Sequence, residues 1–176
     1  QHIAAGQLST RITEPPAQKL EWERRALELA ERSDQPGAQK WRAPLLNNMG
    51  WSHHELGAHE QALALFERAL TLRQAAGDAQ ATHVAGWCVA RELRALGRYS
   101  LALAAQLRLA EALGQRGAAD GYVNEEIGEN LLALGRAAEA RPYFARAHAA
   151  LSQDAWLVET EPGRIERLKQ LSFEVP

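Results

Sequence analysis

The sequence lacks several features that would assign it to common functional classes. It has a single cysteine, Cys88, so no disulfide can form within the chain, which is compatible with a reducing, cytoplasmic compartment. Its 20 basic and 22 acidic residues leave a formal net charge of −2, without the basic excess that nucleic acid requires. No apolar run approaches the length of a membrane span. We therefore expect neither a nucleic-acid partner nor a membrane partner.

Signals for secretion and catalysis are also missing. The segment from Gln1 to Thr10 lacks the basic start and the apolar core of a signal peptide. The chain begins with Gln rather than Met, which indicates a fragment of a longer protein. It contains no glycine-rich phosphate loop and no Gly-x-Ser-x-Gly elbow, and no base is indicated beside Cys88. The sequence predicts a protein that is not an enzyme and has no catalytic residues.

The composition is that of a helical protein. Ala, Leu, Glu, Gln and Arg are abundant, and β-branched residues are few. A length of 176 residues suits one domain with a continuous core. We therefore expect an all-α domain.

A Leu-Gly dipeptide recurs three times, at Leu56-Gly57, Leu96-Gly97 and Leu134-Gly135, with spacings of about 40 and about 38 residues. A small residue stands seven positions before each glycine, and alanine stands five positions after it. Nine positions after the first and third glycines there is an aromatic residue, Phe66 or Phe144, whereas the second repeat has Gln106. The small residues are Gly50, Ala90 and Gly128 before the glycines, and Ala62, Ala102 and Ala140 after them. A fixed period of this size predicts a solenoid.

The spacing has a physical explanation. Small residues on two consecutive helices let the helices approach closely, and Phe66 or Phe144 fills the space beside them. Gly57, Gly97 and Gly135 would each follow a helix end, where glycine adopts a left-handed conformation without strain.

These residues resemble the tetratricopeptide repeat family, whose repeat of about 34 residues has Gly or Ala, Leu-Gly, Ala, an aromatic and Ala at these places. The longer period is similar to the extended repeats of the kinesin light chain and LGN type. The resemblance covers roughly residues 15 to 151. It implies an all-α, right-handed α-α superhelix, a tetratricopeptide-like solenoid of antiparallel helix pairs.

The repeat pattern divides the chain. We expect one domain over residues 1–176, in which 1–38 is a partial repeat, 39–78, 79–118 and 119–151 are repeats, and 152–176 is a capping segment. Each repeat holds two helices, predicted at 39–56 and 59–76, at 79–96 and 99–114, and at 120–134 and 137–151, with Asp120 as an N-cap. Further helices are predicted at 16–33 and 162–171, with a turn at 34–37. Residues 152–162 form a short helix or an irregular turn.

In the family, the first helix of each pair lines a concave groove that binds a protein or a peptide. By resemblance, the groove positions fall on two tryptophans, a tyrosine and several polar residues, types that include the usual carriers of binding energy at interfaces. The groove residues are Asn47, Asn48, Trp51 and His54, then Trp87, Cys88, Arg91 and Arg94, then Tyr122, Glu125, Glu126 and Glu129.

Two interpretations remain open for the asparagines and for the tryptophans. Paired asparagines such as Asn47-Asn48 resemble the kinesin light chain type, where an amide contacts the backbone of an extended peptide as donor and acceptor. Alternatively, the pair bonds neighbouring helices. Trp51 and Trp87 either anchor a ligand in the groove or pack between helices.

The two groove arginines also have two readings. Arg91 and Arg94 form an anion-binding pair, or they make inter-repeat salt bridges with Glu125 and Glu129. The sequence favours the salt bridges.

The histidines do not indicate a metal site. His53, His54 and His59 lie close in sequence, but no two of them have the i, i+4 spacing that places ligands on one helix face. We expect structural histidines, no metal and no cofactor.

The sequence therefore predicts a non-catalytic scaffold that binds a protein or peptide in the groove. The first alternative is a regulatory or peptide-sensing segment of a larger signalling protein. The second is a self-association module that forms a homo-oligomer through exposed end repeats.

Overall fold

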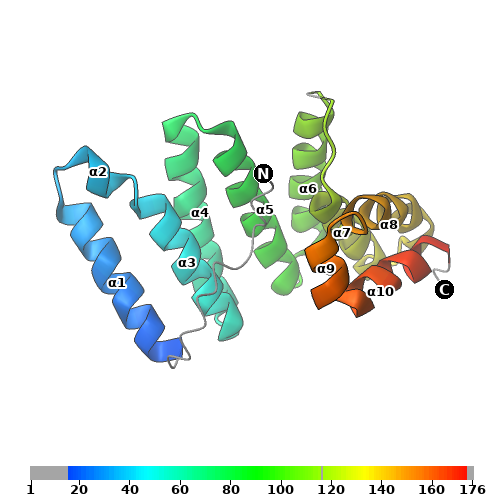
Figure 1. The fold of residues 1–176 in the computed structure, drawn as a ribbon, viewed down its shortest axis with the longest axis horizontal. Helices are drawn as coiled ribbons and strands as arrows, with labels where there is room; N and C mark the ends of the chain where they lie inside the picture. Colours follow the sequence, from blue (N-terminus) through cyan, green and yellow to red (C-terminus); the bar gives the residue numbers. More distant parts are fainter. Residues whose placement is uncertain (1–15, 116, 174–176) are drawn as a thin grey trace. The chain divides into compact units, whose positions relative to one another are not determined.

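The computed structural model describes residues 16–115 and 117–173 of the chain. In this part of the chain every regular element is a helix and no strand occurs (Figure 1). The chain divides into two compact units, Gln1–Glu92 and Leu93–Pro176. The prediction of an all-α helical-repeat fold is confirmed.

The first unit begins with α1 (Pro16–Arg32) and the short α2 (Pro36–Gln39), followed by α3 (Arg42–Glu55) and α4 (His59–Ala76). It also holds most of α5 (Ala79–Ala95). Helix α3 packs against both α1 and α4. Buried residues of these three helices form the core, Leu27, Leu46, Met49 and Ala69.

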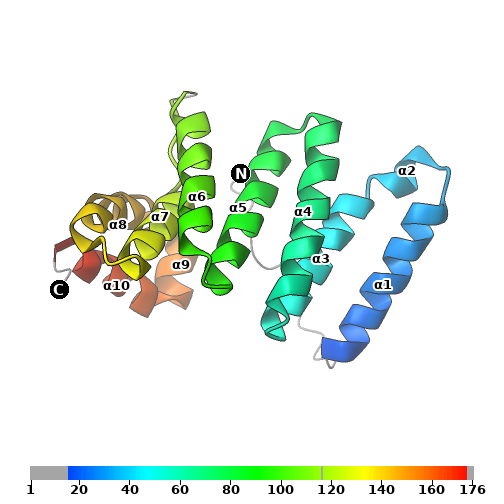
Figure 2. The same ribbon diagram turned by 180° about the vertical axis from the view of Figure 1, so that it is seen from behind.

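The second unit contains α6 (Tyr99–Gly114), α7 (Gly121–Ala133), α8 (Ala137–Leu151), α9 (Ala155–Thr160) and α10 (Pro162–Phe173) (Figure 2). Helix α7 packs against α6 and α8, and α10 packs against α8 and α9. Apolar side chains buried in α7 to α10 include Val123, Ile127, Phe144, Leu157 and Leu168.

The three Leu-Gly turns have the predicted conformation. Gly57, Gly97 and Gly135 have φ angles of 72°, 72° and 73°. At the first turn the amide of Gly57 donates to the carbonyl of His54, and the amide of Ala58 donates to the carbonyl of His53, both at 2.9 Å. These bonds satisfy carbonyl groups at the end of α3 that have no partner within the helix.

The close approach of paired helices is also confirmed. A Cβ atom added to Gly50 of α3 would lie 2.5 Å from Cε1 of Phe66 in α4. A Cβ atom added to Gly128 of α7 would lie 2.8 Å from the same atom of Phe144 in α8. Both phenylalanines are fully buried, so each ring occupies the space that the missing side chain leaves.

The predicted helix bounds agree with the structure to within a few residues. The largest difference is at residues 34–41, where Pro36 starts the short α2 and α3 begins at Arg42 instead of Gln39. The side chain of Asp120 accepts from the amides of Tyr122 and Val123 and is the predicted N-cap of α7. The predictions for residues 1–15 lie outside the described part of the chain. None of the described helices combines the length and the apolar character needed to cross a membrane.

Candidate functional site

One position in each repeat is both buried and polar. It lies five residues before the turn glycine and is occupied by Ser52, Glu92 and Asn130, whose exposed fractions are 1%, 0% and 0%. The Ser52 hydroxyl donates to Oε2 of Glu23 at 3.0 Å, and Nδ2 of Asn130 donates to the carbonyl of Glu126 at 2.7 Å. Most buried polar groups are hydrogen-bonded, and the side chain at this position makes at least one hydrogen bond in each repeat.

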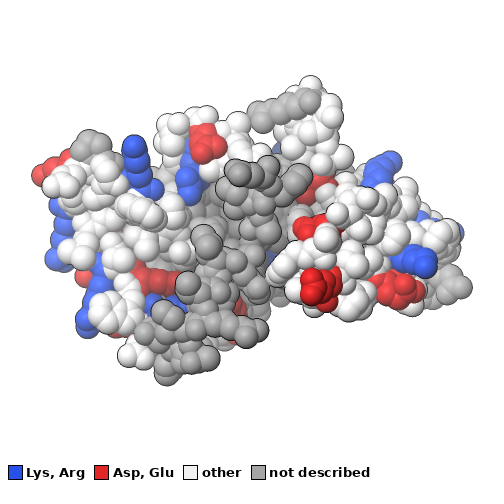
Figure 3. All heavy atoms as spheres, in the orientation of Figure 1, with Lys and Arg blue, Asp and Glu red and all other residues white. Residues whose placement is uncertain are grey.

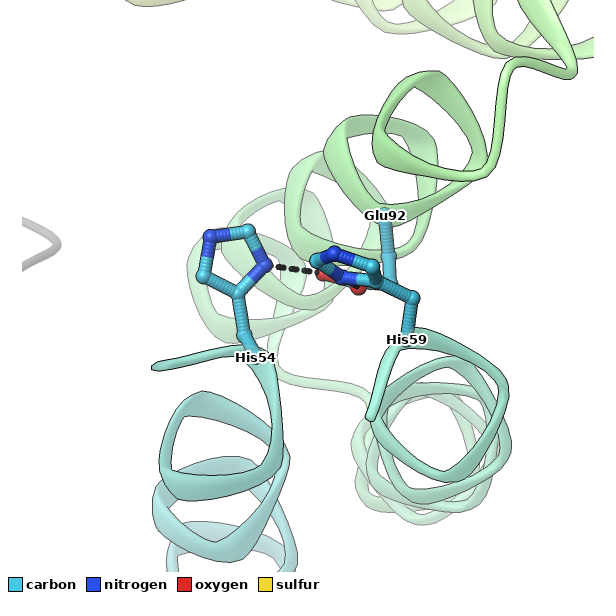
Figure 4. Close-up of side chains that lie close together, drawn as sticks. All are labelled: His54, His59 and Glu92. Carbon is cyan, nitrogen blue, oxygen red and sulfur yellow. Dashed lines mark hydrogen bonds and ion pairs between the residues drawn. The ribbon is translucent and has the colours of Figure 1, made fainter. Parts of the chain in front are cut away.

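The partners of Glu92 are two histidines from the first repeat. His54 lies in the last turn of α3, His59 is the first residue of α4, and Glu92 lies on α5. Nδ1 of His54 donates to one carboxylate oxygen at 2.7 Å, and Nδ1 of His59 donates to the other at 2.6 Å. Figure 4 shows both imidazole rings converging on the carboxylate. The predicted groove residue His54 is therefore held by an internal contact.

This cluster was not predicted from the sequence. Two histidines on one helix bind a common partner when they are four residues apart, but His54 and His59 lie on opposite sides of the Leu-Gly turn. The left-handed residue Gly57 reverses the chain there and brings the two imidazoles together, with ring centroids 5.3 Å apart. The sequence signal for such a pair is a histidine shortly before a Leu-Gly turn and a second histidine shortly after it, as at His54 and His59.

An arginine and two tryptophans form a second cluster in the first unit, on α3 and α5. The ring centroids of Trp51 and Trp87 are 6.2 Å apart. The guanidinium carbon of Arg91 lies 5.9 Å from the Trp51 ring and 5.6 Å from the Trp87 ring, within the range of cation–π contacts. Trp51 also packs edge-on against Phe66, at 5.2 Å, and remains partly exposed. We call Trp51, Trp87 and Arg91 the Trp–Arg cluster.

The two asparagines of α3 differ in their surroundings. Asn48 is exposed, whereas Oδ1 of Asn47 accepts a hydrogen bond from the thiol of Cys88 on α5 at 3.5 Å. Burial raises the pKa of Cys88 to about 12, with Arg91 acting in the opposite direction. Asn47 thus bonds a neighbouring helix, and Cys88 remains a thiol at neutral pH.

Three of the four predicted groove residues of the third repeat are bound by α10. Arg164 donates to both carboxylate oxygens of Glu125, at 2.9 and 2.5 Å, and its guanidinium carbon lies 5.3 Å from the Tyr122 ring. Arg167 forms an ion pair with Glu129. These contacts fix α10 on α7, and they engage the side chains that the resemblance assigned to partner binding.

The inter-repeat salt bridge predicted for Arg94 exists with a different partner. Nε and Nη2 of Arg94 donate to Glu126 at 2.7 and 2.9 Å, whereas Glu125 and Glu129 were the expected acceptors. Burial alone would lower the pKa of Arg94, but the hydrogen bonds and the charge of Glu126 outweigh it, so the pKa is raised. The expected partners are instead bound by arginines of α10, which lies outside the repeat pattern.

Charged groups do not form a large patch of one sign on the face seen in Figure 3. Basic and acidic atoms are interspersed among uncharged ones there, in keeping with the net charge of −2. The described residues on this face therefore form no extended basic surface.

The fold and these clusters define a helical-repeat protein whose consecutive helices pack in pairs. Residues 43–75 match the family model described as "Tetratricopeptide repeat". The chain therefore contains a tetratricopeptide repeat, at the first of the three repeats that the sequence predicts. The kinesin light chain and LGN subtype stays a prediction.

Two solved structures are similar to the chain. The structure titled "MamA MSR-1 C2" matches with a TM-score of 0.50 and 20% identity, over 88% of this chain and 78% of that chain. A second MamA structure, from AMB-1, matches with a TM-score of 0.49 and 22% identity, over 88% of this chain and 74% of that chain. No curated protein matches the sequence significantly. The first likeness supports the fold alone, and the repeat match suggests a protein-interaction scaffold.

Proposed function

We propose that the chain is a non-catalytic protein-interaction scaffold that binds an extended peptide across α3 and α5 of the first unit. The observation that carries this proposal is the Trp–Arg cluster, in which Arg91 lies over both Trp51 and Trp87. Tryptophan and arginine are the residue types that most often dominate binding energy at interfaces.

The chemistry of the cluster favours a peptide with an acidic side chain. A guanidinium group binds a carboxylate through two parallel hydrogen bonds, and the indole rings beside it supply apolar contact area. Arg91 and Trp51 are both partly exposed, so a ligand can reach them. Asn48, exposed on the same helix as Trp51, has an amide that offers a donor and an acceptor to a peptide unit.

The proposed site is confined to the first unit. In the third repeat, Glu125 and Glu129 are bound by Arg164 and Arg167, and Tyr122 lies against Arg164. A ligand at those positions would have to break salt bridges that are already formed within the protein. Asn48, Trp51, Trp87 and Arg91 therefore make up the proposed contact surface.

The proposal is tested with synthetic peptides. Two libraries of extended peptides are compared. In the first, Asp or Glu is placed at each position in turn; in the second, Asn or Gln replaces it. The affinity of each peptide for the chain is measured by fluorescence polarisation. We expect acidic peptides to bind, and Arg91→Gln to weaken their binding by about tenfold, since a charge-assisted hydrogen-bond pair is lost. Asn48→Ala is expected to weaken acidic and amide peptides alike.

A second arginine–tryptophan pair provides the matched control. Arg25 of α1 lies over the ring of Trp22, with the guanidinium carbon 5.7 Å from the centroid, and both side chains are exposed. Arg25→Gln removes the same type of charge beside the same type of ring. The proposal fails if no peptide binds, or if Arg25→Gln weakens binding as much as Arg91→Gln.

A further inference from the structure

We propose that His54, His59 and Glu92 form a binding site for a divalent transition-metal ion of the zinc class. The three side chains come from three different helices, and their ligand atoms all lie within 4.8 Å of one another. The argument for this site does not depend on the peptide surface proposed above.

The ligand set selects the kind of metal. Two imidazole nitrogens and one carboxylate oxygen suit Zn²⁺ and its neighbours, and two histidines with one glutamate is a known zinc ligand combination. Mg²⁺ and Ca²⁺ prefer oxygen ligands throughout, so they fit this set poorly. The site offers three protein ligands, which leaves a fourth tetrahedral position for water or for a group from another molecule.

The geometry needs little adjustment to hold the ion. The two Nδ1 atoms now lie 2.7 and 2.6 Å from the oxygens of Glu92, each with a proton between nitrogen and oxygen. A tetrahedral zinc with bonds of about 2.0 Å separates its ligand atoms by about 3.3 Å. Both histidine side chains are partly exposed, at 23% and 32%, so the rings have room to move outward by this amount. On binding, each neutral imidazole transfers its single proton from Nδ1 to Nε2 by exchange with solvent, and the freed Nδ1 lone pair binds the metal.

The burial of Glu92 is a physical reason for a cation to bind at this site. Its side chain is 0% exposed, and a buried carboxylate is unfavourable unless its charge is compensated. Hydrogen bonds from two imidazoles satisfy the oxygens, but a divalent cation also supplies the opposite charge. The other two repeats have the uncharged Ser52 and Asn130 at this position, so only the second repeat needs such compensation.

A bound ion would link the first repeat to α5. His54 and His59 flank the turn between α3 and α4, and Glu92 is on α5, so the metal would hold three helices at one point. The ring of His54 also lies 5.3 Å from the ring of Trp51, edge-on. An ion at Nδ1 of His54 would therefore fix the ring that packs beside the Trp–Arg cluster.

The test uses the full chain without an affinity tag, after removal of metal by a chelator. Zn²⁺ is titrated by isothermal calorimetry, and Co²⁺ is titrated by visible absorption, which reports the coordination of the ion. We expect one Zn²⁺ per chain with micromolar or tighter affinity, a Co²⁺ spectrum of low coordination number, and a higher melting temperature with Zn²⁺. Mg²⁺ is expected to produce none of these changes.

Single substitutions then assign the ligands. His54→Asn, His59→Asn and Glu92→Gln are each expected to weaken Zn²⁺ binding at least about tenfold, since each removes one ligand. His53→Asn is the control, because His53 is adjacent in α3 but outside the cluster, and it should bind as the native chain does. Circular dichroism checks folding. If Glu92→Gln unfolds, the test relies on His59→Asn, because His59 is partly exposed and its substitution is less disruptive. The proposal is overturned if the native chain binds no Zn²⁺ at micromolar concentration, or if folded His54→Asn and His59→Asn bind it unchanged.

Discussion

At the scale of single residues, the repeat pattern predicts which positions are small or aromatic, because those side chains determine how closely two helices pack. Gly50, Gly128, Phe66 and Phe144 lie where the pattern requires, and all four are buried. The pattern does not predict which polar groups meet. Gln106 takes the aromatic position in the second repeat and is buried, and among the described residues neither of its side-chain amide atoms has a hydrogen-bond partner.

Residue contacts that cross a turn or involve a helix outside the repeats were missed. His54 and His59 meet because Gly57 reverses the chain, and a search for ligands on one helix does not detect such a pair. Glu125 was paired with the wrong arginine, since its partner, Arg164, belongs to the C-terminal helix, which has no place in the repeat. Long charged side chains reach several partners, so sequence spacing alone does not select one.

Cys88 provides a prediction at the residue scale. Burial raises its pKa to about 12, so the folded chain holds the thiol proton at pH values where an unfolded cysteine has lost it. We expect iodoacetamide at pH 8.5 to label the folded chain at least about a hundredfold more slowly than the chain unfolded in guanidinium, because only the thiolate reacts. Labelling at equal rates would contradict the buried placement of Cys88.

The same shift has a consequence for stability. The folded pKa is raised, so folding retains a proton, and the free energy of unfolding falls as pH rises above about 8.5 toward about 12. Cys88→Ala lacks this contribution. Its stability should therefore fall less over that pH range, as measured by urea denaturation at each pH.

At the scale of helices, two glycines are needed for different reasons. Gly50 is required for space, because a Cβ atom there would lie 2.5 Å from the buried ring of Phe66. We expect Gly50→Ala to lower the free energy of unfolding by about 1–3 kcal/mol through overpacking. Gly57 has open space around it but a φ of 72°, so Gly57→Ala is expected to cost about 1 kcal/mol in backbone strain.

A second substitution distinguishes overpacking at Gly50 from backbone strain at Gly57. Phe66→Leu should recover part of the loss in the Gly50→Ala background, because a smaller side chain leaves room for the methyl group. The same change should not compensate Gly57→Ala. Gly37→Ala in α2, where nothing lies within 4 Å of the added Cβ atom, is the neutral control. Chemical denaturation measures the three glycine variants, Phe66→Leu alone and the two double variants, and equal coupling in both pairs would contradict the packing explanation.

At the scale of the whole molecule, the sequence predicted the helical-repeat fold because its small residues and glycines recur with a fixed period. Function was predicted less completely, since a repeat fold supports many partners. Within the first unit, Arg91 lies over Trp51 and Trp87, and these three side chains form the proposed recognition site. In the second unit, arginines of α10 engage the corresponding positions of the third repeat. For these reasons we propose that recognition occurs on the first unit.

The most direct test of this account is a nuclear magnetic resonance titration that follows the indole N–H signals of the five tryptophans. An acidic peptide that binds the chain is added to the labelled protein, and single Trp→Phe variants assign each signal. We expect the signals of Trp51 and Trp87 to shift, while those of the exposed Trp22, Trp41 and Trp156 do not. Shifts at the three exposed tryptophans, with Trp51 and Trp87 unchanged, would contradict it.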